Sequence, residues 1–361
     1  MKNWIYILYI GLIGFFAASC QPSSDELDGT GSLVEKAQIT FRIALDNLDS
    51  PSRAAGDWEE IENASMPYAV IGDEYENQID LTTQNGLQVL VYSADGTTYY
   101  GEVVNKLFVR KATDNGRVYE FSGDLSIDAA YMGDDGTLPC RLMVFANAPK
   151  VNHTSLGLTA FAYNSTYIPM WGVQQCTLTL QKGELFRVEN PIYLLRSMAK
   201  VEVKLADAIK NSLNMTAVKV DKYNSQGYVL PTGYGSSNST QALFQQPVFN
   251  PYLTKVSTGL SFHKDAGGAY YIYLPEYKNS GDGADKAVMK VMVDGQEYDL
   301  HFKNYSTGAT FDIIRNHYYQ YIITDVINDV LVADLLYQSM PWEDVDNGNL
   351  NFGNGTGNVM N

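Results

Sequence analysis

The chain has 361 residues, 45% of them hydrophobic, and a formal net charge of −16 at pH 7. That length and apolar content can fill two cores of ordinary size or one large core. The strong negative charge, with no basic patch to offset it, argues against nucleic acid and anionic lipid headgroups as partners of the folded body. The 26 tyrosines favour strands over helices.

The N-terminal segment has the pattern of a bacterial lipoprotein leader. Lys2 is followed by an apolar run at 4–16 and by small residues at 17–19, directly before Cys20. The run is too short for a membrane-spanning helix and matches a signal peptide with a small-residue cleavage site. We expect residues 1–19 to be removed and Cys20 to be acylated, because several acyl chains on one residue give a stable anchor. The alternative is a plain secretory signal with a chance cysteine.

The segment after Cys20 predicts a tether, a strand and an exposed loop. Residues 21–32 are rich in Ser, Gly and acids. The following residues alternate strictly, and one face carries only apolar side chains: Ala37, Ile39, Phe41, Ile43 and Leu45. This period of two predicts a half-buried strand at 37–45. Residues 46–56, which contain Arg53 and Ala54, have the composition of an exposed loop.

Short strand patterns recur through the rest of the chain. They lie at 87–92, 99–109, 118–125, 141–146, 176–180, 184–188, 198–205, 270–274, 288–293, 298–302, 318–323 and 329–338. Turn residues at 94–96 and 181–183 predict hairpins between the strands on either side. Helical periodicity is nearly absent, so we expect an all-β fold of two antiparallel β-sandwiches. The expected parts are a signal peptide at 1–19, a propeptide with tether and removable strand at 20–53, an N-terminal domain at 54–190, a C-terminal domain with donor segment at 191–343 and a polar tail at 344–361.

Motifs that would carry chemistry are incomplete. Residues 197–200 fit Ser-x-x-Lys, but they lie inside a strand pattern, and the motifs that complete such an active site are missing. Residues 344–348 lack the third ligand and the closing Glu of a calcium loop. The histidines lack zinc-site spacing and are scattered over the chain: His153, His263, His301 and His317. We therefore expect no enzyme, and no catalytic residue, metal site or cofactor.

Beyond Cys20 the chain contains two further cysteines, Cys140 and Cys176. They could pair in an oxidising exterior, or they could remain two buried free thiols. Two cysteines in a chain of this length do not make a disulfide framework.

Several short blocks, taken in order, resemble the fimbrillin family, the lipoprotein-derived subunits of type V pili in Gram-negative anaerobes. The chain is most similar to the major fimbrial subunits. The blocks are the leader ending at Cys20, the strand at 37–45, the segment 51–56, and the sequences Leu-Met-Val-Phe-Ala-Asn at 142–147, Arg-Ser-Met-Ala-Lys-Val-Glu-Val at 196–203, Tyr-Leu-Pro-Glu at 273–276, Arg-Asn-His-Tyr-Tyr at 315–319 and Trp342. The chain departs from stalk subunits in continuing past Trp342 with an Asn- and Gly-rich tail.

The resemblance implies two tandem transthyretin-like antiparallel β-sandwich domains after a lipoprotein signal peptide. It also implies a precursor held by lipid in the cell outer membrane and a cut between Arg53 and Ala54 by an extracellular Arg-specific protease. The mature protein would then be a subunit of a surface fimbrium that supports adhesion. Its partners would be other fimbrial subunits, of the same or a related chain, and a host or bacterial surface ligand.

The residues themselves suggest how such a subunit would polymerise. Burying four large apolar side chains of the strand at 37–45 contributes very roughly 6–12 kcal/mol, which is comparable with the stability of a whole domain. A cut at Arg53 would leave this removable strand joined only to the lipid anchor, and the groove it vacates would accept another strand. The expected donor is the segment at 329–338 with Val330, Val332, Leu335 and Tyr337, continuing to Trp342. A bulge or break is expected near Asp334, since Val330 and Val332 share its face.

Two other functions use the same features differently. Without the cut, the protein would stay on the membrane as an anchor or accessory subunit. As an adhesive tip module it would bind glycans or proteins through the tyrosine pairs at 99–100, 270–271 and 318–319. Adjacent tyrosines in a strand usually place one ring inward and one outward, which favours a structural role for these pairs.

Overall fold

The computed structural model describes residues 26–27, 33–44, 58–60, 70–71, 79–80, 86–112, 118–162, 167–179, 185–231, 255–256, 259–279, 286–303, 310, 312–327 and 330–339. The leader, the tail and five of the predicted site residues lie outside this part of the chain: Cys20, Leu45, Arg53, Ala54 and Trp342.

The first half of the chain forms two facing sheets. One contains, in spatial order, β1 (Glu26–Leu27), β2 (Leu33–Ala44), β9 (Val118–Asp128), β8 (Val104–Ala112) and β3 (Trp58–Glu60), and β13 (Leu185–Arg187) and β14 (Ile192–Tyr193) also pair with β2. The other contains β15 (Leu195–Arg196), β12 (Met170–Thr179), β10 (Thr137–Ala146), β6 (Leu87–Ser93) and β7 (Tyr99–Glu102).

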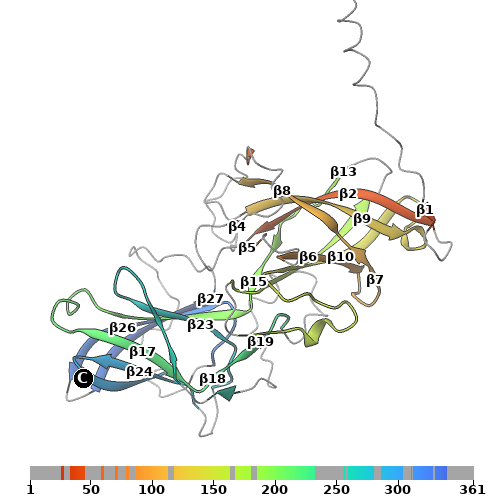
Figure 1. The fold of residues 1–361 in the computed structure, drawn as a ribbon. Helices are drawn as coiled ribbons and strands as arrows, with labels where there is room; N and C mark the ends of the chain where they lie inside the picture. Colours follow the sequence, from red (N-terminus) through yellow and green to blue (C-terminus); the bar gives the residue numbers. More distant parts are fainter. Residues whose placement is uncertain are drawn as a thin grey trace, which may run out of the picture.

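The second half forms another pair of facing sheets. The five-stranded one contains β22 (His263–Lys264), β23 (Tyr270–Pro275), β16 (Met198–Leu205), β26 (His317–Ile327) and β27 (Val330–Ser339). The four-stranded one contains β21 (Leu260–Ser261), β17 (Met215–Asp221), β24 (Val288–Val293) and β25 (Gln296–His301). In Figure 1 the two halves appear as two lobes, with β2, β8 and β9 in one and β17, β24 and β26 in the other.

The remaining described elements are short. They are the strand pairs β4 (Val70–Ile71) with β5 (Ile79–Asp80), β11 (Ala160–Ala162) with β19 (Gln226–Tyr228) and β18 (Tyr223–Asn224) with β20 (Lys255–Val256), and the 3-10 helices η2 (Ala129–Tyr131) and η3 (Leu156–Leu158). No α-helix occurs among the described residues, and within them no helix is long and apolar enough to cross a membrane.

Each pair of sheets encloses its own hydrophobic core, so the predicted all-β architecture of two sandwiches is confirmed. The first core lies between β2, β8 and β9 on one side and β6, β10 and β12 on the other. The second lies between β16, β23 and β26 on one side and β17, β24 and β25 on the other. The alternation predicted at 198–205 is also confirmed: Ala199, Val201 and Val203 are fully buried, while Lys200, Glu202 and Lys204 are half-buried.

A third hydrophobic cluster joins the two halves. It packs the outer face of β6, β10 and β12 against β16, β23 and β26, with Phe145, Trp171, Met198 and Tyr273 among its members. β10 is therefore covered on both faces, which explains why residues 142–146 form a continuous apolar run instead of alternating.

Two details of the predicted strand order are wrong. The turn at 181–183 does not join a hairpin, because β12 pairs with β10 and β15, whereas β13 crosses to the other sheet and pairs with β2. The strand predicted at 99–109 is two strands, because the chain leaves one sheet after β7 and enters the facing sheet with β8. The predicted hairpin around 94–96 is confirmed, since β6 and β7 pair antiparallel.

Candidate strand-exchange site

β2 is an internal strand with partners on both of its edges. Along one edge it pairs antiparallel with β9 from Val34 to Ala44. Along the other edge it meets β1 at its start and then runs parallel to β13 and β14. Backbone hydrogen bonds from the amides of Val188 and Leu194 to the carbonyls of Thr40 and Ala44, at 2.8 and 2.9 Å, extend this parallel edge. We call the space that β2 occupies between β9 and the β13–β14 edge the β2 slot.

The inward face of β2 is fully buried, as its sequence alternation predicts. Ile39, Phe41 and Ile43 are 0% exposed, and Phe41 stacks on Phe121 of β9 with ring centroids 5.8 Å apart. Complete burial of three such side chains contributes about 5–9 kcal/mol before entropy is counted. Ala37 is buried beside them, and Gln38 on the opposite face is exposed.

The layer across the core from β2 holds the slot in shape. Val89, Val91, Leu142 and Val144 of β6 and β10 are 0% exposed in the same core. Gly172 of β12 lies so close to β14 that a Cβ there would come within 2.4 Å of the Tyr193 carbonyl oxygen. Glycine at this position therefore allows the strand that lines one edge of the slot to approach the second sheet.

β27, the predicted donor segment, is an edge strand. It pairs antiparallel with β26, from Val330 opposite Ile327 to Ser339 opposite His317. Within the described part of the chain, β27 has no partner strand on its other edge. β27 is therefore paired along one edge, whereas β2 is paired along both.

The predicted irregularity lies close to Asp334 along the strand pair, but the extra residue belongs to β26 and not to β27. The register steps from Ile323 opposite Ala333 to Asp325 opposite Val332, which leaves Thr324 as the extra residue. The Thr324 hydroxyl donates to the carbonyl of Val332 at 3.3 Å. β27 itself runs without interruption through Asp334.

An uninterrupted β27 changes which of its residues share a face. Leu331 is buried in the second core, whereas Val330 is 61% exposed and Val332 is half-buried. Side chains alternate along a regular strand, so Val330 and Val332 lie on the opposite face from positions 335 and 337. A break in β27 at Asp334 would have brought all four to one face. In register, Leu335 and Tyr337 lie opposite Tyr321 and Tyr319 of β26.

Three of the sequence blocks noted above meet at a buried polar cluster between the halves. We call it the junction cluster; its members are Arg196, Ser197, Val229, Glu276, Arg315 and Asn316. The guanidinium of Arg315 contacts a carboxylate oxygen of Glu276 at 2.7 Å and donates to the carbonyls of Val229 and Tyr228 at 2.8 and 3.0 Å. The Ser197 hydroxyl donates to the same Val229 carbonyl at 2.9 Å.

Asn316 closes this cluster through its backbone conformation. Its φ is +57°, in the left-handed region that Asn tolerates better than most residues. In that conformation its amide donates to the carbonyl of Met198 at 2.8 Å, and its side-chain oxygen accepts from the amide of Arg196 at 3.2 Å. The sequence patterns mark these residues only as parts of strands and do not predict the cluster; the Arg and Glu at strand ends are the one signal that the sequence offers.

The histidines occupy separate places in the fold. His153 stacks on Tyr99 with ring centroids 4.2 Å apart, and His263 lies beside Tyr271. Nδ1 of His317 donates to the carbonyl of Arg315 at 2.9 Å, and burial lowers the pKa of His317. Burial also lowers the pKa of His301. Among the described residues, no three His, Cys, Asp or Glu side chains gather as a metal site would require.

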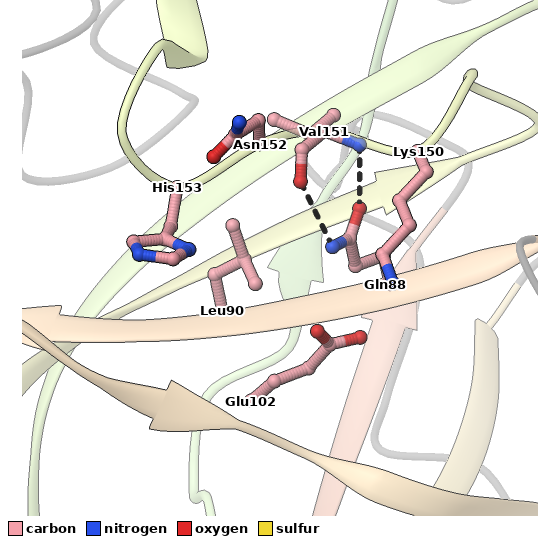
Figure 2. Close-up of a pocket in the computed structure, with 7 residues that line it drawn as sticks. All are labelled: Gln88, Leu90, Glu102, Lys150, Val151, Asn152 and His153. Atoms are coloured by element: carbon pink, nitrogen blue, oxygen red, sulfur yellow. Dashed lines mark hydrogen bonds between the residues drawn. The ribbon is translucent and has the colours of Figure 1, made fainter.

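A cavity of about 330 Å³ lies between β6, β7 and the 150–153 segment, lined by Gln88, Leu90, Glu102, Lys150, Val151, Asn152 and His153. Figure 2 shows the Gln88 amide bonded twice to the backbone of Val151: its nitrogen donates to the carbonyl at 3.1 Å and its oxygen accepts from the amide at 2.9 Å. Gln88 thus holds the 150–153 segment against β6, much as a neighbouring strand would.

A wider groove of about 930 Å³ lies over the five-stranded sheet of the second half. Gln320 crosses it, donating to Glu202 and to the Tyr318 hydroxyl, both at 2.8 Å. Tyr318 is 7% exposed, with the Lys200 ammonium 5.4 Å above its ring. The pair at 318–319 splits between the two faces as predicted: Tyr319 lies in the second core, and Tyr318 lies on the opposite face, where the third cluster covers its ring as well.

No protein-family model and no curated protein matches the chain. Similar solved structures include the tip fimbrial protein Mfa3 of Porphyromonas gingivalis with a C-terminal truncation (12% identity, TM-score 0.47, covering 85% of this chain and 100% of that one). A putative cell adhesion protein of Parabacteroides distasonis is 14% identical with a TM-score of 0.47, covering 84% of this chain and 96% of that one. A fimbrilin (fimA) of Porphyromonas gingivalis is 13% identical with a TM-score of 0.43, covering 85% of this chain and 98% of that one.

Proposed function

We propose that the protein is a structural subunit of a cell-surface fimbrium that polymerises by donor-strand exchange. It is exported as a lipoprotein acylated at Cys20 and cut between Arg53 and Ala54 by an extracellular Arg-specific protease. β2 then leaves its slot, and the C-terminal segment of another subunit, of the same or a related chain, takes its place. The assembled fimbrium supports adhesion at the cell surface.

The observation that carries the proposal is the position of β2 in sequence and in space. β2 contributes three fully buried side chains to the first core, yet its only links to the rest of the chain are the segments at 28–32 and 45–57. A cut at Arg53 severs the second link. The lipid-bearing piece would then be held by noncovalent contacts alone.

An empty slot would be costly in free energy, so the binding of another strand there would be strongly favoured. β9 would keep β8 on one edge but lose its partner on the other edge, and the amides of Val188 and Leu194 would lose the carbonyls they now bind. Buried backbone groups without partners are costly, and Phe121 would face a void where Phe41 now stacks. A strand with apolar side chains at alternate positions would both pair with the exposed backbone groups and fill the void beside Phe121.

β27 provides such a strand. Positions 331, 333, 335 and 337 are Leu, Ala, Leu and Tyr, an uncharged set with the spacing of Ile39, Phe41 and Ile43. The other set includes Asp334. We therefore assign the donor face to Leu331, Leu335 and Tyr337, and we exclude Val330 and Val332, which the sequence pattern had included.

The experiment that tests this function is N-terminal sequencing of fimbriae sheared from cells, together with the Arg53→Ala and Arg53→Lys variants. We expect fibres that start at Ala54, and uncut precursor without fibres in both variants, because an Arg-specific protease does not accept Lys. Cells that assemble normal fibres from Arg53→Ala would refute the processing step. A mature chain that starts at acylated Cys20 would instead identify an anchor or accessory subunit.

A further inference from the structure

The two cysteines beyond the leader face each other across neighbouring strands. Cys140 of β10 and Cys176 of β12 are direct partners in the antiparallel register, and their Sγ atoms lie 3.6 Å apart. Directly opposite residues on antiparallel strands have Cα atoms about 4.5–5.5 Å apart, within the range that a disulfide spans. Only the side chains need to turn for the sulfurs to reach bonding distance.

The surroundings leave each thiol one partner. Cys140 is 0% exposed inside the first core, and Cys176 is half-buried beside it. The chain has three cysteines, and the proposed lipidation consumes Cys20. Burial of Cys140 therefore excludes a bridge from this cysteine to a second molecule in the folded state, which leaves Cys176 as its partner.

We propose that Cys140 and Cys176 form a cross-strand disulfide in the exported protein. The thiolate of one attacks the disulfide of an exported thiol–disulfide oxidoreductase, which gives a mixed disulfide and releases one oxidoreductase thiolate. The second cysteine, having lost its proton, attacks the mixed disulfide and releases the other. Two electrons and two protons pass from the cysteine pair to the oxidoreductase, which is left as a dithiol.

The structure also sets when this bridge forms. Cys140 is 0% exposed in the folded state, so an oxidoreductase or a mixed disulfide cannot reach it there. The contact with Cys176 and burial also raise the pKa of Cys140, which disfavours its thiolate. Oxidation therefore precedes the closing of the first core. Once formed, the bridge is shielded from reductants by the same burial.

The location gives the bridge a function in strand exchange. β10 and β12 belong to the layer that faces β2 across the first core. When β2 leaves, that layer loses one side of its packing, and a covalent tie between its two central strands resists fraying until a donor arrives. This consequence depends on the proposed function, whereas the bridge itself depends only on export.

The test uses the full chain, exported by its own leader, harvested with an acid quench and alkylated in denaturant before reduction. We expect an intact mass lower by two hydrogens than after reduction, no alkylation of Cys140 or Cys176, and a linked peptide pair in the digest. The Cys140→Ser variant is the matched control, and its Cys176 should be alkylated without reduction. The uncut Arg53→Ala precursor should carry the same bridge, which separates this test from fibre formation.

Alkylation of both cysteines without reductant, in chain whose leader has been removed, would overturn the proposal. A second measurement tests whether the disulfide forms before the first core closes. Chain refolded with an excess of a small-molecule disulfide should acquire the bridge, whereas chain folded under reducing conditions and exposed to the same disulfide afterwards should acquire it at least about tenfold more slowly. Equal rates would contradict formation before the core closes.

Discussion

β2 and β27 have opposite situations in the same fold. β2 has strands on both edges, and its inward side chains Ile39, Phe41 and Ile43 have no exposure, whereas among the described residues β27 pairs with β26 alone and leaves Val330 61% exposed. The strand proposed to leave is thus the better held, and the strand proposed to be donated is the easier to free. Emptying the slot is therefore the uphill step, and filling it is the downhill step. Such an arrangement keeps a monomer closed until it is cut.

The largest effect expected is the loss of all fibres in Arg53→Ala, because β2 then stays covalently bound in its slot. The measurement is electron microscopy of surface extracts with N-terminal sequencing of the retained precursor. The matched control is Lys210→Ala, which removes an exposed cation of the second half that pairs with the exposed Asp207. Fibres that vanish equally in this control would mean that the loss does not come from blocked cleavage.

Phe41→Ala tests whether β2 belongs to the precursor alone. In the uncut chain we expect it to lower the free energy of unfolding by about 3–5 kcal/mol, because the side chain is fully buried against Phe121. Denaturant unfolding of purified precursor measures this value, with Gln38→Ala on the exposed face as a control expected to change it by less than about 0.5 kcal/mol. In assembled fibres the substitution should have no effect, since β2 has left; a destabilised fibre would show that β2 stays.

Leu331→Ala tests the reassigned donor face on the weaker strand. We expect a loss of about 2–3 kcal/mol in precursor stability, at the low end for a buried leucine because β27 is an edge strand. Val330→Ala, one position away and mostly exposed, should change stability by less than about 0.5 kcal/mol. The same pair compared in fibre dissociation assigns the face that enters the slot: a greater effect of Val330→Ala would restore the face first predicted from the sequence.

The smallest effect concerns pH at the end of the β26–β27 pair, where His317 lies opposite Ser339. Burial lowers the pKa of His317, so as pH falls below about 6.5 the unfolded chain binds the proton first. The free energy of unfolding should therefore fall as the pH drops below about 6.5 and stay unchanged above that pH. Unfolding curves at several pH values measure the slope, and His317→Gln should reduce it. His301, whose pKa burial also lowers, supplies the comparison variant His301→Gln.

The sequence predicts individual strands better than their partners. Strict alternation predicted the inward faces of β2 and β16, because along most of each strand one face meets a core and the other carries polar side chains. Alternation carries no information about which strand lies alongside. For example, β12 and β13 follow each other in the sequence but lie in facing sheets, and so do β7 and β8. Their alternation patterns do not reveal this.

The candidate site shows the same limit. The strands β2 and β27 were both visible in the sequence, yet the buried face of β27 was not, because the extra residue sits in β26 and leaves β27 regular. The junction cluster was hidden for a different reason. Arg196, Glu276 and Arg315 are far apart in the chain, and it is the fold of the second half that brings Glu276 and Arg315 together at 2.7 Å.

The β2 slot has one antiparallel wall and one parallel wall. An intruding strand that ran the wrong way would exchange these two hydrogen-bonding patterns, so the slot distinguishes direction. Under the proposed exchange, each joint then links the tail of one subunit to the body of the next, a head-to-tail contact that builds an open filament wherever its rotation does not close a ring. The resulting filament is polar: one extremity carries an unfilled cleft and the other an unused tail, and growth can stop only when a subunit of a different kind caps one of them.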